Sequence, residues 1–387
     1  MKQRVIVCLV SRQTIPNYLF IKEKYTPGDR VVLIATKGDM EQCESCLRDT
    51  LTMSGNWHNL KIDSLKFDKK NDEWNWTLLN NKMHEWFPAQ ANTIYMANIT
   101  GGTKLMSLAL FMRMKELAGS QIFYMPFSGE SRIDCLGEKT QTKEISVTVT
   151  PEEYLRLYGQ SNIQLSQPKF DKETCHTIYK NWGKKTEFAE IKDFIQSKRG
   201  KNIYIHPQNQ NEKKAFDEYR IHDNPIDMER LERYLETIGF VRKEENKLDK
   251  NEVDFLSGGW FEEWTYYSIK EKLELSDCDI VTNVKVKTDN NQPTKELDVV
   301  FTKNNKLYII ECKSGYDKKM MNMGKLIKEV AGIRDSLGSL NANSIIFILG
   351  SGHDEISENS WQTSANEFKI KLYTEETIRN GNCFSFI

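Results

Sequence analysis

The chain has 387 residues, which is enough for two or three domains with hydrophobic cores of their own. A formal net charge of −1 excludes a protein that binds nucleic acid through a general basic field. No apolar run is long enough to cross a bilayer, no signal peptide opens the chain and the eight cysteines form no disulfide framework, so we expect a cytoplasmic protein with no membrane contact.

The first 130 residues alternate between apolar, strand-like runs and helical patterns. Strands are predicted at 5–10, 30–35, 93–98 and 121–125, with a weaker strand signal at 60–64, and helices are predicted at 15–25, 40–53, 74–86 and 104–117. This rhythm predicts a parallel sheet with helices on both faces. Ligands of such sheets bind beyond the carboxyl ends of the strands.

A glycine pair lies between one of these strands and the next helix. Gly101 and Gly102 let the backbone approach a ligand closely, and the free N–H groups of the following helix favour an anion. Thr100, Thr103 and Lys104 add donors and a positive charge. Because neither the P-loop pattern nor G-x-G-x-x-G is present, we expect a phosphate rather than a dinucleotide. A tight turn without a ligand is the alternative.

Two further polar segments follow strands at the same edge of the predicted sheet. Residues 11–17, which read Ser-Arg-Gln-Thr-Ile-Pro-Asn, come after the first strand, and Thr36-Lys37 comes after the second. Hydroxyls, amides and two lysines would therefore meet in one crevice.

The middle of the chain is polar and mostly helical in pattern. A short connecting helix is expected within 148–165, ended by Gly159, and 202–211 is expected to be a loop. Basic residues gather in two runs, which are either solvated helix faces or a track for a nucleic-acid backbone. The runs contain Lys180, Lys184, Lys185, Lys192, Lys198, Arg199 and Lys201, and then Lys318, Lys319, Lys325 and Lys328.

Two acidic strands near the C-terminus indicate catalysis. Segments 295–301 and 307–313 are joined by a polar stretch, which predicts a hairpin with Asp298 beside Glu311 and Lys313. Unpaired charge on such apolar strands is costly. Two carboxylates that hold a divalent metal, with a lysine beside the attacked phosphate, would explain it. A solvated strand edge is the alternative.

A third acidic residue, Glu262, lies on a helix predicted from Gly258 to about residue 275. The order Glu262, then Asp298, Glu311 and Lys313, resembles the PD-(D/E)xK nuclease superfamily, although Leu297 stands where many members have proline. The resemblance implies that the three acids and the backbone carbonyl of Cys312 bind Mn²⁺ or Mg²⁺, and that Lys313 orients water and offsets phosphate charge.

The N-terminal motifs V-S-x-Q-T-x-P-N and N-x-T-G-G-T-K-x-M-S resemble CRISPR-associated Rossmann-fold (CARF) domains. The pairing with the C-terminal motif resembles type III CRISPR ancillary nucleases. This implies a homodimer that binds a cyclic oligoadenylate, usually cyclic tetra-adenylate. The residues implied to line the ring are Ser11, Gln13, Thr14, Asn17, Thr36, Lys37, Thr100, Gly101, Gly102, Thr103, Lys104, Met106 and Ser107.

The resulting prediction is an α/β protein in three parts. They are a Rossmann-like CARF domain at 1–147, a linker and helical connector at 148–250, and a restriction-endonuclease-like PD-(D/E)xK α/β domain at 251–387. The family resemblance implies a ring-activated endonuclease for single-stranded RNA and single-stranded DNA, with nicking of duplex DNA as a further option.

Three alternatives remain. The first is a ring sensor whose nuclease domain is weak or vestigial. The presence of all four motif residues, Glu262, Asp298, Glu311 and Lys313, argues against this alternative. The second is a CARF pocket that cleaves the ring itself, although no histidine falls at the strand ends. The third is a repair or restriction nuclease with an unrelated N-terminal domain, which conflicts with the Gly-Gly-Thr-Lys crevice.

Overall fold

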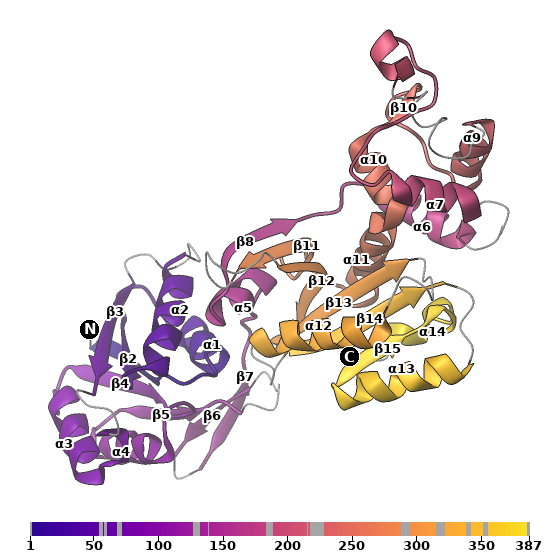
Figure 1. Cartoon of the computed structure of the whole chain (residues 1–387). Helices are drawn as coiled ribbons and strands as arrows, with labels where there is room; N and C mark the ends of the chain where they lie inside the picture. The colour runs from indigo at the N-terminus through magenta and orange to yellow at the C-terminus, as the bar shows by residue number, and fades with distance from the viewer. Residues whose placement is uncertain are drawn as a thin grey trace.

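The protein is described by a computed structural model, which covers residues 2–53, 57, 60–67, 72–126, 132–137, 139–182, 189–214, 216, 228–287, 295–314, 322–337, 342–350 and 355–384. Two large sheets with surrounding helices lie next to each other, and a smaller helical lobe stands beyond the second sheet (Figure 1). The predicted α/β class is confirmed. Among the residues that the structure describes, no helix combines the length and apolar character needed to cross a membrane.

The N-terminal sheet has the strand order β3-β2-β1-β4-β5-β6-β7. Five strands are parallel, as predicted: β1 (Gln3–Leu9), β2 (Arg30–Ala35), β3 (Lys61–Lys66), β4 (Thr93–Asn98) and β5 (Gln121–Tyr124). An antiparallel pair that the sequence analysis did not predict, β6 (Arg132–Leu136) and β7 (Gln141–Glu144), extends one edge.

Helices cover both faces of this sheet. Side chains of α1 (Ile15–Lys24) and α2 (Asp39–Met53) pack in one hydrophobic cluster, and those of α3 (Trp76–Trp86) and α4 (Lys104–Glu116) pack in another. A short 3-10 turn, η1 (Asp72–Trp74), precedes α3. The chain leaves β1 for β2 and β3 and then returns to place β4 on the other side of β1. The carboxyl ends of β1 and β4 therefore border the crevice that this type of sheet uses for ligands.

The C-terminal sheet has the order β15-β14-β13-β12-β11-β8. Its strands are β8 (Ser161–Ser166), β11 (Ile280–Lys287), β12 (Lys295–Lys303), β13 (Lys306–Ser314), β14 (Ala342–Leu349) and β15 (Ile370–Tyr373). One face packs against α11 (Trp260–Lys272) and α14 (Glu375–Arg379), which precedes the 3-10 turn η4 (Asn382–Phe384). Part of the other face packs against α12 (Met323–Ser336) and α13 (Glu355–Glu367).

The connection between the sheets contains both an expected and an unexpected element. The expected helix is α5 (Pro151–Leu157), which begins with a capping box between Thr150 and Glu153 and is followed by Gly159 at φ +82°. The unexpected element is β8, whose polar sequence gave no strand signal and which pairs with β11 at an edge of the sheet.

A single hydrophobic cluster runs from the first sheet through α5 to the second. It contains Ile6 of β1, Tyr154 and Leu155 of α5, and Val300 and Ile309 of the second sheet, all of them buried. Figure 1 accordingly places α5 between the two sheets. Because separating the sheets would expose this apolar surface to water, the two domains share a core rather than meeting through a flexible tether.

The helical lobe contains α6 (Lys172–Asn181), α7 (Ala189–Ser197), α9 (Met228–Thr237) and α10 (Lys250–Asp254). Two short strands, β9 (Ile203–Tyr204) and β10 (Lys247–Leu248), pair within the lobe, and β9 lies in the segment that was predicted to be a loop. A π-helical turn, η3 (Phe255–Gly259), joins α10 to α11, with non-helical angles at Gly258. The lobe is thereby attached directly to the helix that carries Glu262.

Candidate functional site

The acidic hairpin is present, with the predicted pairing of β12 and β13. Val299 lies opposite Ile310, and the two strands are joined by a two-residue turn, Asn304–Asn305, in which both residues have positive φ (52° and 60°). Asparagine tolerates this conformation and suits the twist of a tight hairpin. The turn is therefore shorter than the five-residue polar stretch predicted from the sequence.

Three of the four predicted catalytic side chains are in direct contact. Lys313 Nζ lies 2.5 Å from Glu311 Oε1 and 3.8 Å from Asp298 Oδ2. Asp298 is buried, and its Oδ2 also accepts a hydrogen bond from the backbone N–H of Cys312 at 2.8 Å. The hairpin register thus brings one ammonium group between two carboxylates.

The fourth residue, Glu262, lies in the first turn of α11 and lines the same cavity of about 330 Å³. Burial raises the pKa of Glu262 to about 7; the positive charges of Lys313 and Arg199 oppose this rise, and Glu296 and Glu311 add to it by repulsion. The predicted set therefore meets in one cavity, although Glu262 makes no direct hydrogen bond to the other three in the described structure.

The charges in this cavity are not balanced. Burial, and then repulsion from Glu311 and Glu262, raises the pKa of Asp298 well above its usual range. Although burial alone would lower the pKa of Lys313, the carboxylates of Asp298 and Glu311 raise it. Four carboxylates and two cationic side chains line the cavity, counting Glu262, Glu296, Asp298, Glu311, Arg199 and Lys313. An additional cation would relieve the repulsion.

The donor atoms fit a hard divalent cation, which prefers carboxylate and carbonyl oxygens. Cys312 fits only through its backbone: its thiol is buried and contacts Thr265 Oγ1 at 3.5 Å, within the core beneath α11. Within the described ranges no three Asp, Glu, His or Cys side chains already converge into a metal-binding group. The ammonium of Lys313 supplies the positive charge between Asp298 and Glu311 in this structure.

The glycine pair after β4 is required by close packing. A Cβ atom at position 101 would lie 2.0 Å from the backbone oxygen of Leu9, at the end of β1. Gly102 has a φ of +74°, which favours glycine. These two positions bring the loop after β4 against β1, as the predicted crevice requires.

Several predicted ring-binding residues are exposed or half-buried just beyond the ends of β2 and β4. Lys104 is the first residue of α4 and is exposed, as are Gly102 and Lys37, while Thr36 is half-buried. Thr103 caps α4 by accepting a hydrogen bond from Met106 N at 3.2 Å. Other half-buried polar groups stabilise the loops: Ser107 Oγ donates to Gly101 O at 2.9 Å, Ser11 Oγ donates to Gln13 O at 3.2 Å, and Thr100 Oγ1 accepts from Met125 N at 2.8 Å.

Three of the predicted ring-binding side chains are buried instead. Met106 lies in the hydrophobic core, Asn17 Nδ2 donates to Leu9 O at 2.7 Å, and Thr14 Oγ1 donates to Leu157 O at 2.9 Å. Asn98, which opens the motif N-x-T-G-G-T-K-x-M-S but was not predicted to bind the ring, is fully buried and donates to Asn17 Oδ1 at 2.8 Å. The described contacts of these side chains support the crevice loops from behind.

The connector helix contacts both sites. Tyr158, just after α5, donates its hydroxyl hydrogen bond to Gln13 Oε1 at 2.9 Å, beside the crevice. At the other end of α5, Val149 N donates to Asn305 Oδ1 at 3.0 Å. Asn305 belongs to the turn of the same hairpin that carries Asp298 and Glu311. The sequence analysis assigned no role to Tyr158 or Asn305, because neither belongs to a recognisable motif.

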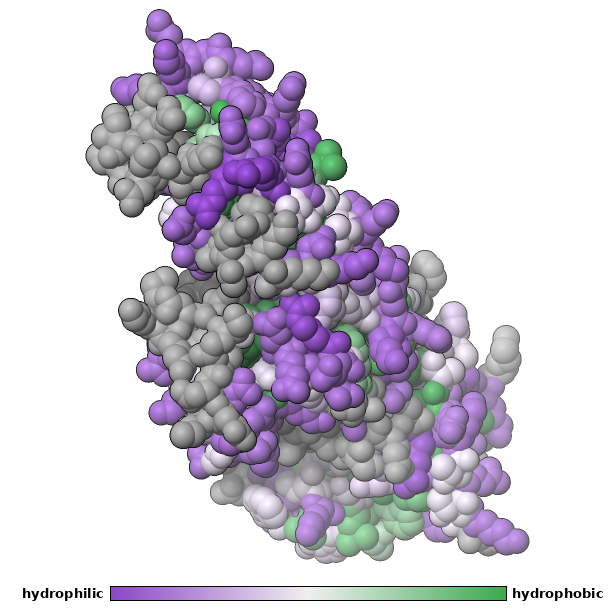
Figure 2. Space-filling model, turned by 90° about the vertical axis from the view of Figure 1, so that its right-hand side faces the viewer, coloured by the Kyte–Doolittle hydropathy of each residue, from purple (hydrophilic) through white to green (hydrophobic). Residues whose placement is uncertain are grey.

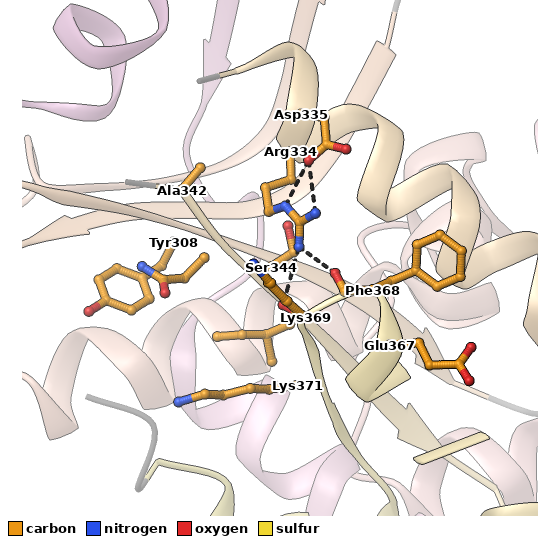
Figure 3. A pocket seen from close by; sticks show the side chains of 11 residues that line it. Tyr308, Arg334, Asp335, Ala342, Ser344, Glu367, Phe368, Lys369 and Lys371 are labelled. Carbon is orange, nitrogen blue, oxygen red and sulfur yellow. Dashed lines mark hydrogen bonds and ion pairs between the residues drawn. The ribbon is translucent and has the colours of Figure 1, made fainter. Parts of the chain in front are cut away.

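A second cavity, of about 440 Å³, lies in the C-terminal domain and is lined by residues near the end of α12, the start of β14 and the start of β15 (Figure 3). Its arginine, Arg334, is engaged in contacts with the protein: Nη1 donates to Phe368 O at 2.5 Å and to Lys369 O at 3.2 Å, and Nη2 pairs with Asp335 Oδ1 at 2.8 Å. This guanidinium stabilises the end of α13 and the start of β15. The cavity contains none of the predicted catalytic residues.

The overall arrangement is shared with solved structures. Can2 from Sulfobacillus thermosulfidooxidans, in complex with cyclic tetra-adenylate, is 19% identical with a TM-score of 0.64, and the match covers 96% of this chain and 95% of that one. Protein VC1899 from Vibrio cholerae is 16% identical with a TM-score of 0.71, covering 97% and 95%.

A type III CRISPR defence DNA nuclease activated by cyclic oligoadenylate is 15% identical with a TM-score of 0.53. That match covers 98% of this chain but 51% of that one, so the present chain spans about half of its length. No curated protein matches the sequence.

Two family models match separate parts of the chain. The Card1 CARF domain matches residues 5–154, which include the crevice, and the Card1-like endonuclease domain matches residues 249–376, which include the acidic hairpin and α11. The chain therefore joins a Card1-type CARF domain to a Card1-like endonuclease domain.

Proposed function

We propose that this protein is a metal-dependent endonuclease that cyclic tetra-adenylate switches on. The observation that carries the proposal is the contact of Lys313 with Glu311 and Asp298 in a cavity that Glu262 also lines. An ammonium group between carboxylates at the end of a hairpin suits phosphodiester hydrolysis and has no evident structural purpose on strands this apolar. The arrangement supports our assignment of this domain to the PD-(D/E)xK nucleases.

In this proposal Glu262, Asp298, Glu311 and the carbonyl of Cys312 hold Mn²⁺ or Mg²⁺. When bound, the cation would supply Lewis-acid polarisation of the phosphodiester and would neutralise part of its charge. Lys313 orients the attacking water and stabilises the charge that develops on the phosphate. The hydrogen bond from Cys312 N fixes the orientation of the Asp298 carboxylate, so this ligand needs little rearrangement.

The ring would bind at the carboxyl ends of β1, β2 and β4. Can2 binds cyclic tetra-adenylate and shares the fold. The N-terminus of α4 offers N–H groups to a phosphate, and the exposed Lys104 adds positive charge there. Gly101 packs on Leu9 and so holds this end of the helix beside β1. Thr36, Lys37, Ser11 and Gln13 would contact the ring, while Thr14, Asn17 and Met106 would shape the pocket from the core.

A homodimer would complete the ring site. On α4, Leu108 is 48% exposed and Met112 is 44% exposed, one turn apart, and Trp74 near the same helix is 62% exposed. An isologous contact along α4 would bury these side chains. Because the loop at 100–104 leads directly into α4, such a dimer would place two copies of the loop close together, to match a ring with two-fold symmetry.

Activation would pass through α5. Its C-terminal end contacts Gln13 and Thr14 at the ring crevice, and its N-terminal end contacts Asn305 of the catalytic hairpin. A ring that binds one placement of Gln13 more tightly than another therefore biases the position of α5 and of the hairpin. We accordingly propose residues 1–147 as the sensing domain, 148–250 as the connector and 251–387 as the cutting domain.

The direct test is a cleavage assay with labelled single-stranded RNA, single-stranded DNA and supercoiled plasmid. Each substrate is incubated with Mn²⁺, Mg²⁺ or EDTA, with and without cyclic tri-, tetra- or hexa-adenylate. We expect metal-dependent cutting of the single strands, stimulated most by the four-membered ring. A cleavage rate that is the same with and without each ring would refute activation by the ring. Binding of a ring without any cutting would identify a sensor, and linear adenylate products would identify ring cleavage.

A further inference from the structure

One wall of the acidic cavity does not come from the endonuclease sheet. Gln196 and Arg199, at the end of α7 in the helical lobe, line the cavity together with Glu262, Asp298 and Glu311. The lobe therefore reaches the place where the substrate would lie. In Figure 2, the lobe at the top of the molecule has a mostly hydrophilic surface, which suits contact with water or with a polyanion.

The segment that carries Arg199 is held in place. Phe194 and Ile195 of α7 are buried in the cluster that also contains Trp260 and Phe261 of α11. Just beyond Arg199, Gly200 N donates to Asp254 Oδ1 at 2.7 Å, which fastens the turn to α10. The guanidinium is thus positioned by the same packed frame that positions Glu262.

The guanidinium of Arg199 forms no ion pair with any residue that the structure describes. Its side chain is exposed, and no carboxylate of the described residues lies within ion-pair distance of the guanidinium, although it is close enough to Glu262 to lower the pKa of that group. The neighbouring lysines, in contrast, contact aromatic rings of the protein. Lys192 Nζ lies 4.1 Å from the centre of the Trp182 ring, and Lys198 Nζ lies 5.5 Å from the centre of the Phe194 ring. Lys184 and Lys185 of the predicted basic run lie outside the described residues.

We propose that Arg199 binds a phosphate of the nucleic-acid strand next to the bond that is cut, and that Gln196 supports this contact. The inference deepens the proposed function and rests on it. A guanidinium presents two parallel N–H donors to a phosphate and carries its charge at every working pH. Lys313, which lines the same cavity, would serve the attacked phosphate, so the strand would run between the lobe and the end of the hairpin.

The test measures strand binding apart from cleavage. The full-length protein carries D298N to prevent cutting, and binding of a fluorescein-labelled single-stranded 20-mer, as RNA and as DNA, is followed by anisotropy across a sodium chloride series with Mn²⁺ and cyclic tetra-adenylate. R199A is compared with R199K and with K201A, which removes an exposed charge two residues away that does not line the cavity.

We expect R199A to weaken binding about tenfold and to reduce the salt slope by about 1, with R199K in between and K201A close to the parent. In the cleavage-competent protein, R199A should raise KM more than it lowers kcat. Unchanged melting temperature and ring affinity would exclude a general loss of structure.

If R199A matches K201A in affinity and slope while the parent binds and cuts, this inference is wrong and the proposed function stands. If the parent neither binds nor cuts any strand, both fail.

Discussion

The two sites of this protein manage charge in opposite ways. The crevice after β1 and β4 consists of glycine backbone, hydroxyls and amides, with Lys37 and Lys104 exposed at its edge. The cavity at the end of β13 concentrates Glu262, Asp298 and Glu311. Burial and repulsion from Glu311 raise the pKa of Glu262 and of Asp298, and Lys313 pairs with Glu311. A site that receives a charged ligand needs donors and little charge of its own, whereas a site that gathers a cation carries repulsion until the cation arrives.

This difference also determines how each site can fail. The crevice depends on close backbone packing, so added volume is its weakness. The cavity depends on a few charges, so removal of one charge is its weakness. Substitutions matched to each weakness separate sensing from cutting.

The largest effect is expected from loss of the lysine in the cavity. Lys313→Ala removes the charge that offsets Asp298 and Glu311 and that would stabilise the phosphate. We expect the cleavage rate to fall about a thousandfold, with ring affinity unchanged. Single-turnover cleavage and calorimetry with the ring measure the two properties. Lys328→Ala, on an exposed position of α12, is the matched control, and equal activity of the two variants would disprove the assignment.

The crevice is tested by a single methyl group. Gly101→Ala adds a Cβ atom that would lie 2.0 Å from the backbone oxygen of Leu9, so the loop must move away from β1. We expect ring affinity to fall at least about tenfold, and the protein to lose about 1–3 kcal/mol of stability. Gly137→Ala, whose Cβ would meet nothing closer than 3.7 Å, should change neither. Normal ring binding by the Gly101 variant would remove this loop from the binding site.

The proposed dimer is tested at α4. Leu108→Lys puts a charge into the exposed apolar stripe, so we expect weaker self-association and weaker ring activation, with metal-dependent binding of strand retained. Light scattering after gel filtration gives the mass at several protein concentrations. A wild-type protein that stays monomeric with the ring present would contradict the dimer outright. Val241→Lys, at an 86% exposed position in the lobe, is the control.

The connection between the sites is tested by one hydroxyl. Tyr158→Phe removes the hydrogen bond to Gln13, which contributes about 0.5–1.5 kcal/mol, so ring activation should drop up to about tenfold while the unstimulated rate stays unchanged. Tyr179→Phe removes a buried hydroxyl for which the described structure contains no hydrogen-bond partner. Comparable activation of both variants would show that α5 does not transmit the signal through this contact.

The last test concerns how stability depends on pH without metal. Because the pKa of Glu262 is raised to about 7, the folded protein keeps a proton that the unfolded chain has released, so this group makes stability fall as pH rises from about 4.5 to about 7. Glu262→Gln should therefore be more stable than the parent at pH 8 in EDTA, by about 1–3 kcal/mol, and the gain should vanish near pH 4.5.

Thermal unfolding with and without Mn²⁺ measures both parts of this expectation. Added Mn²⁺ should raise the melting temperature of the parent more than that of Glu262→Gln, because the variant lacks one ligand. A parent that is already more stable than the variant at pH 8 in EDTA would contradict the raised pKa. An equal response of both proteins to Mn²⁺ would remove Glu262 from the metal set.

Local pattern was sufficient for most of the fold. The alternation of apolar runs and helical segments predicted the five parallel strands, and the acidic strands predicted their hairpin, because burial and strand alternation act within a few residues. The polar strand β8 and the antiparallel pair β6–β7 escaped prediction. These strands lie at or near sheet edges, where one neighbour provides the hydrogen bonds and few side chains need to be apolar.

The sequence by itself determined which residue types stand at the ends of the strands, and hence the chemistry of both sites. Only the tertiary structure decided which of those side chains face a cavity. Thr14, Asn17 and Met106 are buried, while Arg199 reaches the acidic cavity from a lobe about sixty residues before Glu262. The tertiary structure also joined Gln13 to Tyr158 and Val149 to Asn305. Such contacts depend on how separate elements pack, and nothing in the local sequence around either partner encodes the other.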